Sequence, residues 1–223
     1  MTDINILLLT ATVLGFTHTI LGPAHYAPFI VLSKARRWNI GRTLFTTFYC
    51  GLGHLASSII IGIVGIIIGL GIERVTFFDS FRGNLAGWAF FSFGVVYMAW
   101  GMFRAIKNKP HTHCNAHLND KQHVHGNGKT NLTPWILFLI FALEPCEILA
   151  PLLMYPAAQH NIGAIISVSL LFSTVTILTM CVAVVIGYYG FKAIFTDKID
   201  RFMHAIAGAT ICLSGLAILF LES

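Results

Sequence analysis

Charged side chains are scarce in this sequence: aspartate, glutamate, lysine and arginine make up only 10% of its 223 residues. Soluble domains contain roughly 25% of these residues, so the composition excludes an ordinary soluble globular protein. Hydrophobic residues, by contrast, make up 56% of the chain. We therefore expect an all-α integral membrane protein whose main partner is the lipid bilayer.

Several common functional signatures are also missing. The sequence has no glycine-rich nucleotide-binding loop, no His-Glu-x-x-His motif and no Gly-x-Ser-x-Gly motif, so we expect neither an enzyme nor an organic cofactor. No segment combines basic residues with interleaved aromatic residues, which argues against a nucleic-acid partner. Four of the five cysteines lie in apolar segments, so nothing indicates a disulfide framework.

Long apolar runs dominate what is present. Six runs are long enough to cross about 30 Å of hydrocarbon. They are approximately Ile4–Leu32, Thr43–Gly71, Leu85–Ile106, Thr133–Tyr155, Ile162–Phe191 and Phe202–Leu221. We therefore predict six transmembrane helices.

Two similar segments interrupt the first and fourth runs: Gly22-Pro23-Ala24-His25 and Glu144-Pro145-Cys146-Glu147. Proline frees the carbonyl four residues earlier, and an ionisable side chain is costly to bury there. One such break in each half is typical of a duplicated transporter with its site near the bilayer midplane. We predict two inverted three-helix repeats, residues 1–106 and 132–223, with helices 1 and 4 broken at proline and a polar loop at residues 107–131.

The positions of the basic residues predict the orientation. All but two of the 14 lysines and arginines fall in the loops after helices 1, 3 and 5. Loops rich in these residues face the cytoplasm. We expect a bacterial cytoplasmic (inner) membrane protein with both termini outside, and we expect the two exceptions, Arg74 and Arg82, in loops on the outer side.

Three histidines lie within the apolar runs. His18 and His25 are seven residues apart, which is about 10.5 Å along an unbroken helix, so one ion cannot contact both unless the helix unwinds at Gly22-Pro23. Otherwise they would form two successive stations on one path. His54 lies in the second run, on one helical face with Thr47, Cys50 and either Ser57 or Ser58.

Glu144 and Glu147 flank Pro145 in the fourth run. A carboxylate near the bilayer centre costs several kcal/mol unless it is paired, protonated or bound to a cation. We expect no lysine or arginine inside any of the six spans to neutralise these carboxylates, so the available partners are the histidines and an incoming cation. Cys146 adds a soft ligand. We predict that a site for a divalent transition metal, such as nickel, cobalt or zinc, is built from these residues: His18, His25, His54, Glu144, Cys146 and Glu147.

The polar loop carries a second cluster of metal ligands, which are His111, His113, Cys114, His117, His123 and His125. Such clusters bind metals loosely, without fixed geometry. We expect this loop to capture or sense ions at the cytoplasmic mouth of the protein, which favours export.

The segment from Gly15 to Pro28, with His18 and His25, resembles the first-helix motif of the urease-accessory-type (UreH-like) membrane proteins. These are related to nickel/cobalt exporters of the NicO type within the lysine-exporter superfamily. Gly53-His54 resembles a second part of that pattern. The resemblance implies six helices and movement of a divalent metal. Ala24 stands where the family usually has an acidic residue, and we expect Glu147 to supply the negative charge.

Two other functions stay open. Pro145-Cys146 is similar to the fourth-helix motif of membrane thiol-disulfide reductant carriers of the cytochrome c biogenesis type. The matching position in helix 1 is Ala24, which leaves half of a redox pair. The other alternative is an assembly factor for a metalloenzyme. A homodimer is also left open.

Overall fold

The structure, a computed structural model, describes residues 2–68, 72–107, 132–146, 148–194 and 202–221. These residues are almost entirely helical and contain no strand. The all-α class is therefore confirmed. The loop ligands His111, His113, Cys114, His117, His123 and His125 lie outside the described residues, as does Glu147.

The first apolar run is divided into three elements. Helix α1 spans Thr2–Leu21, the single turn η1 spans Pro23–His25, and helix α2 spans Ala27–Ala35. The fourth run is divided in the same way, into α5 (Leu132–Leu143) and α6 (Leu149–Ala158). Both runs are thus interrupted where their prolines predicted.

The other helices are continuous: α3 (Ile40–Ile68), α4 (Ile72–Lys107), α7 (Ile162–Ile194) and α8 (Met203–Leu221). Together with α1, they make five helices in the described residues that are long and apolar enough to cross a membrane. Large apolar side chains cover their outer surfaces, as lipid contact requires: Leu9, Val96, Leu170, Ile186 and Phe220 are all more than half exposed.

Helix α4 differs from its prediction. It begins at Ile72 rather than near Leu85, so Arg74 and Arg82 are helical residues and not loop residues. The additional turns contain Asp79 three residues before Arg82, and these two side chains form an ion pair at 3.2 Å. The pair offsets its own charge, which allows the helix to continue through a charged segment.

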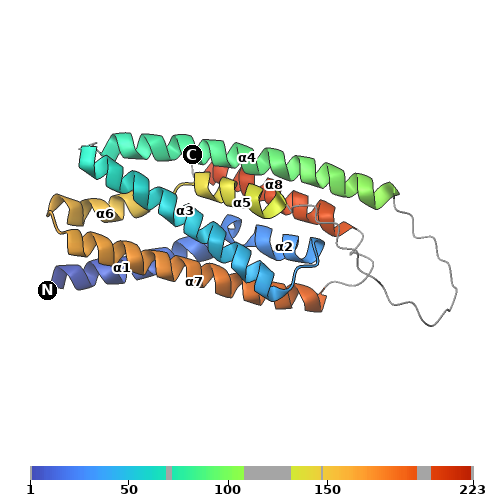
Figure 1. Ribbon diagram of the computed structural model, residues 1–223, viewed down its shortest axis with the longest axis horizontal. Coiled ribbons are helices and arrows are strands. Elements are labelled where there is room, and N and C mark those ends of the chain that lie inside the picture. Colours follow the sequence, from blue (N-terminus) through green and yellow to red (C-terminus); the bar gives the residue numbers. More distant parts are fainter. Residues whose placement is uncertain (1, 69–71, 108–131, 147, 195–201, 222–223) are drawn as a thin grey trace.

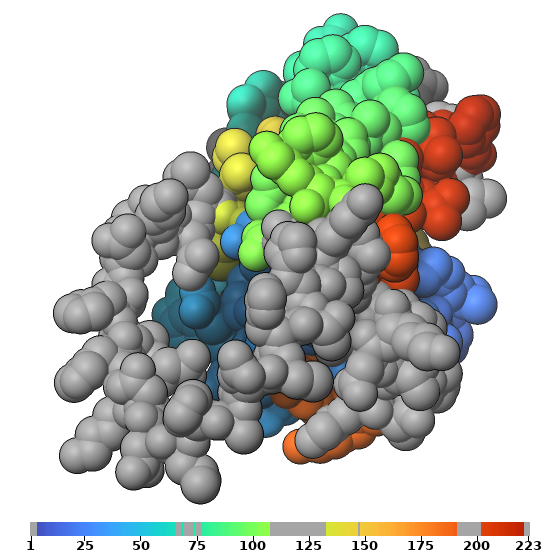
Figure 2. Space-filling model, turned by 90° about the vertical axis from the view of Figure 1, so that its right-hand side faces the viewer, coloured from blue at the N-terminus to red at the C-terminus, as the bar shows by residue number. Residues whose placement is uncertain are grey.

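Helices α4 and α8 lie side by side in antiparallel directions (Figure 1). Their contact surface is built from glycines seven residues apart: Gly87, Gly94 and Gly101 on α4, and Gly208 and Gly215 on α8. Small residues let helix backbones approach closely, which is how membrane helices commonly associate. Viewed end-on, α4 and α8 occupy one side of the bundle, while α3 and α7 lie on the other (Figure 2).

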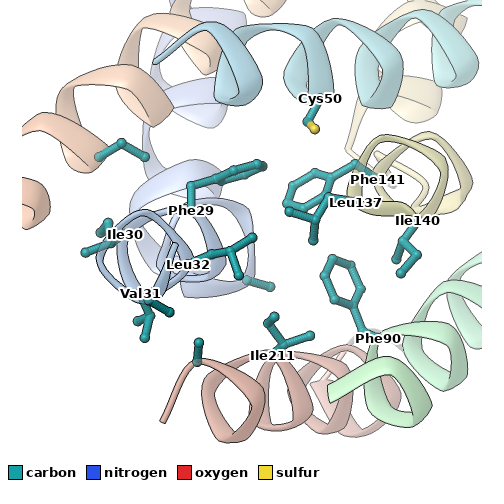
Figure 3. Packing of buried hydrophobic residues seen from close by; sticks show 14 of the residues in the cluster. Phe29, Ile30, Val31, Leu32, Cys50, Phe90, Leu137, Ile140, Phe141 and Ile211 are labelled. Carbon is teal, nitrogen blue, oxygen red and sulfur yellow. The ribbon is translucent and has the colours of Figure 1, made fainter. Parts of the chain in front are cut away.

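Two apolar clusters fill the interior. The first joins α2, α4, α5 and α8 through fully buried Phe29, Phe90, Phe141 and Ile211 (Figure 3). The second lies between α1, α3, α6 and α7. Ala24 of the first break belongs to the first cluster and Cys146 of the second break belongs to the second cluster. The two breaks therefore lie where the clusters meet.

Candidate metal centre

The break after α1 brings two distant histidines together. Gly22 leaves the helical conformation (φ −94°, ψ 82°), and Pro23 opens the turn η1. As a result, His25 Nε2 lies 3.1 Å from His18 Nε2. A Cβ atom on Gly22 would come within 2.8 Å of the His25 ring, so the close approach depends on glycine. The unwinding predicted at Gly22-Pro23 is present, and it brings the two imidazoles into contact.

The break after α5 is held open by side chains from α3 and α4. Beyond Leu143, the Cys146 N–H donates to Ser58 Oγ at 2.9 Å instead of to the helix. The Ala142 carbonyl accepts a hydrogen bond from Arg82 Nη2 at 3.1 Å. Backbone groups at membrane depth must be satisfied within the protein, and these two contacts provide that.

His54 of α3 also supports this break and keeps one ring nitrogen for another partner. Its Nδ1–H donates to the Glu144 carbonyl at 3.0 Å, which leaves Nε2 as an acceptor. His54 Nε2 is buried and has no hydrogen-bond partner among the described residues. Metal-bound histidines typically anchor their second ring nitrogen to a carbonyl or carboxylate in this way.

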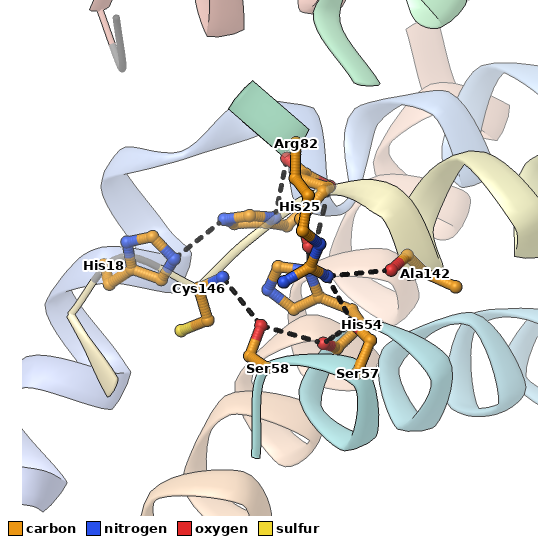
Figure 4. Close-up of polar contacts among 9 residues, drawn as sticks. His18, His25, His54, Ser57, Ser58, Arg82, Ala142 and Cys146 are labelled. Atoms are coloured by element: carbon orange, nitrogen blue, oxygen red, sulfur yellow. Dashed lines mark hydrogen bonds and ion pairs between the residues drawn. The ribbon is translucent and has the colours of Figure 1, made fainter. Parts of the chain in front are cut away.

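Donor atoms from both breaks and from α3 converge on one region (Figure 4). One ring nitrogen each of His18 and His54 and the Cys146 sulfur all lie within 4.8 Å of one another. His25 lies against His18, and its Nδ1 is 3.7 Å from Glu144 Oε1. Ligands of a tetrahedral zinc ion lie about 3.3–3.8 Å apart, so about 1 Å of side-chain movement would bring the set to bonding distance.

Four of these five side chains are buried, and His18 is partly exposed. The exposed fractions are 2% for His25, 1% for both His54 and Cys146, and 0% for Glu144. The Glu144 carboxylate lies between two imidazoles, since Oε2 is 4.0 Å from His54 Nδ1. Burying a carboxylate is costly without nearby positive charge or hydrogen-bond donors. A cation beside Glu144 would lower this cost.

Arg82 is a residue near the site that sequence reasoning missed. It lies inside the membrane-compatible part of α4, Phe77–Lys107, and donates to Ser57 Oγ at 2.8 Å. The expectation that no lysine or arginine lies inside a span is therefore wrong. Asp79 was the available signal, because an acidic and a basic residue three positions apart can pair and enter a helix together.

Five of the six predicted core ligands are brought together: His18, His25, His54, Glu144 and Cys146. The sixth, Glu147, lies outside the described residues. Glu144 is the carboxylate that contacts the imidazoles. Cys50, which shares the predicted polar face of α3 with His54, packs instead in the first apolar cluster (Figure 3).

No family model, curated protein or solved structure matches this chain. The resemblance to UreH-like proteins thus remains a prediction. The case for a function depends on the donor geometry and on the helical architecture.

Proposed function

We propose that this chain is an integral membrane secondary transporter of a divalent transition-metal cation such as nickel, cobalt or zinc. One observation carries the proposal: imidazole, thiol and carboxylate donors from three separate segments meet in a buried region between two broken helices. Such ligands suit divalent transition metals rather than magnesium or calcium. The metal is the transported substrate.

The local charges suit a divalent ion. With neutral imidazoles, the described carboxylates of Glu144 and Asp79 and the guanidinium of Arg82 leave one net negative charge. A metal binds cysteine as the thiolate, so loss of the Cys146 proton would add a second negative charge. A divalent cation would then balance the site, whereas a monovalent cation would leave it negative. Anion transport is disfavoured because the atoms that would bind a metal offer lone pairs, which repel an anion.

The helix contacts support a duplicated, inverted architecture. The first half (α1 to α4) and the second half (α5 to α8) each begin with a broken helix followed by two continuous ones. Contacts occur in matching pairs: α1 packs on α7 as α5 packs on α3, and α2 packs on α8 as α6 packs on α4. The antiparallel pairing of α4 with its counterpart α8 is what an in-plane two-fold axis would give. We infer alternating access by movement of one repeat against the other.

The orientation and direction of transport follow from charge. The C-terminal ends of α2 and α4 and the N-terminal end of α3 lie together at one end of the bundle (Figure 1). The residues at or next to these helix ends include Arg36, Arg37, Arg42, Arg104 and Lys107. We place this end in the cytoplasm and both termini outside. The histidine-rich segment at residues 111–125 follows Lys107, the last residue of α4, in the sequence. It would collect ions there, and we therefore favour export.

Transport by purified protein in liposomes is the direct test. Ni²⁺, Co²⁺, Zn²⁺ and, as a hard-cation comparison, Mg²⁺ would be offered to vesicles that contain a metal-sensitive dye. We expect flux of at least one transition metal and none of Mg²⁺. His25→Ala should abolish that flux. His160→Asn is the matched control, because His160 is exposed just beyond the C-terminal end of α6, and this variant should transport normally.

Two outcomes would overturn the proposal. The first is the absence of flux for every transition metal in vesicles where the folded protein is verified, which would favour an assembly factor. The second is flux that survives His25→Ala.

The variant Cys146→Ser distinguishes a metal transporter from a thiol-disulfide carrier. In a metal transporter this variant should only weaken metal flux, whereas in a thiol-disulfide carrier it should abolish thiol-disulfide exchange. Metal analysis of protein with and without residues 107–131 would separate buried ions from ions held loosely by the loop.

A further inference from the structure

A basic cavity lies at the turn between α2 and α3, away from the metal centre. It has a volume of about 410 Å³ and is lined by Arg36, Arg37, Trp38, Asn39 and Arg42. Three of these five residues are arginines and none is acidic. None of the ion pairs between described residues involves these arginines. The cavity therefore presents concentrated positive charge at the end of two apolar helices.

The structure holds two of the guanidinium groups in place. Arg36 donates from Nε to Tyr97 Oη at 3.1 Å and from Nη2 to Thr133 Oγ1 at 2.6 Å, which ties α2 to α4 and α5. Arg42 lies over the Trp38 ring at 5.2 Å. Arginines held in this way lose less entropy on binding a ligand than free surface side chains do. The cavity is thus a built site rather than a patch of mobile lysines and arginines.

An exposed apolar strip continues from this cavity along α3. Phe45, Tyr49 and Leu52 follow Arg42 at positions i+3, i+7 and i+10, and are 61%, 49% and 41% exposed. These spacings place them on the same helical face as Arg42. A ligand with an anionic head and an apolar tail fits this arrangement, whereas a free phosphate ion would use only the cavity.

We propose that this cavity binds the phosphodiester headgroup of an anionic phospholipid, with an acyl chain lying along Phe45 and Tyr49. Guanidinium groups bind phosphate oxygens by paired, charge-assisted hydrogen bonds. Tryptophan is favoured at the depth of the headgroups, and basic cavities at the cytoplasmic ends of membrane helices are suited to anionic lipids. This inference does not depend on metal transport.

Native mass spectrometry of the full chain in detergent would test the site. Phosphatidylglycerol, cardiolipin and phosphatidylcholine would be titrated separately, and glycerol phosphate would serve as the anion without acyl chains. We expect saturable binding of the two anionic lipids and at least about tenfold weaker binding of the other two compounds. The double variant Arg37→Gln/Arg42→Gln should bind anionic lipid at least about tenfold more weakly, since it removes two of the three guanidinium groups that line the cavity.

Both substituted side chains are exposed, so the double variant should fold, and an unchanged melting temperature without lipid would verify this. Arg74→Gln is the matched control, because Arg74 is an exposed arginine near the other end of the bundle; it should bind lipid normally. Three results would each overturn the proposal. The first is a loss of lipid binding in Arg74→Gln as large as in the double variant. The second is phosphatidylcholine binding as tight as that of the anionic lipids, and the third is glycerol phosphate binding as tight as theirs. The last result would identify a site for soluble anions. Phe45→Ser should weaken the binding of anionic lipid and leave the binding of glycerol phosphate unchanged.

Discussion

His54 offers the sharpest test of the metal centre, because its two ring nitrogens have separate tasks. Nδ1–H donates to the Glu144 carbonyl at 3.0 Å, while Nε2 belongs to the donor set. Asparagine places its amide nitrogen near the position of Nδ1 and offers nothing at Nε2. His54→Asn should therefore keep the support of the break and lose the ligand. His54→Ala should lose both.

The expected magnitudes follow from these contacts. Removing a partner that merely orients a ligand lowers metal affinity about 10–100-fold, so removal of the ligand itself should lower it by about 100-fold or more. That corresponds to about 2.7 kcal/mol of binding free energy. His54→Ala also leaves the buried Glu144 carbonyl without its donor, which costs about 1–3 kcal/mol of stability. His54→Asn should avoid most of that second cost.

The assay is calorimetric titration with Ni²⁺ and Zn²⁺, together with thermal unfolding followed by tryptophan fluorescence. Loose binding by the loop would be removed in all variants by changing its five histidines and Cys114 to serine. We expect His54→Asn to unfold near the wild-type temperature and to bind metal about 100-fold more weakly. Metal affinity within about threefold of wild type in this variant would refute the assignment of Nε2 as a ligand.

Two further substitutions test the fold. Gly94→Leu should separate α4 from α8, since even a Cβ atom at Gly94 would lie 2.6 Å from Cys212 Cα. Overpacking of this kind typically lowers the free energy of unfolding by about 1–3 kcal/mol or more. We expect a lower melting temperature. Gly190→Ala is its control, because a Cβ atom there meets nothing within 4 Å, and an equal loss in both variants would contradict the close contact. Ser58→Ala removes the acceptor of the buried Cys146 N–H and should destabilise by about 1–3 kcal/mol; an unchanged melting temperature would show that the break does not need α3.

The sequence alone was sufficient for the class of protein and for the positions of the breaks. Scarce charge and long apolar runs indicate a membrane protein because hydrocarbon selects against charge over every residue of a span. Pro23 and Pro145 favour breaks in their helices through a local cause, the missing N–H. Local causes of this kind can be identified without knowing the neighbours of a residue.

The composition of the candidate site was decided only by tertiary structure. A spacing of seven residues from His18 to His25 would place the two imidazoles far apart on a regular helix, and the turn at η1 brought their Nε2 atoms to 3.1 Å. Arg82 was predicted in a loop, but its pair with Asp79 and its bonds to Ser57 and Ala142 hold it inside the bundle. The bonds of Arg82 to Ser57 and Ala142 join α4 to α3 and α5. Their energies depend on packing between those helices, and no short stretch of sequence contains that information.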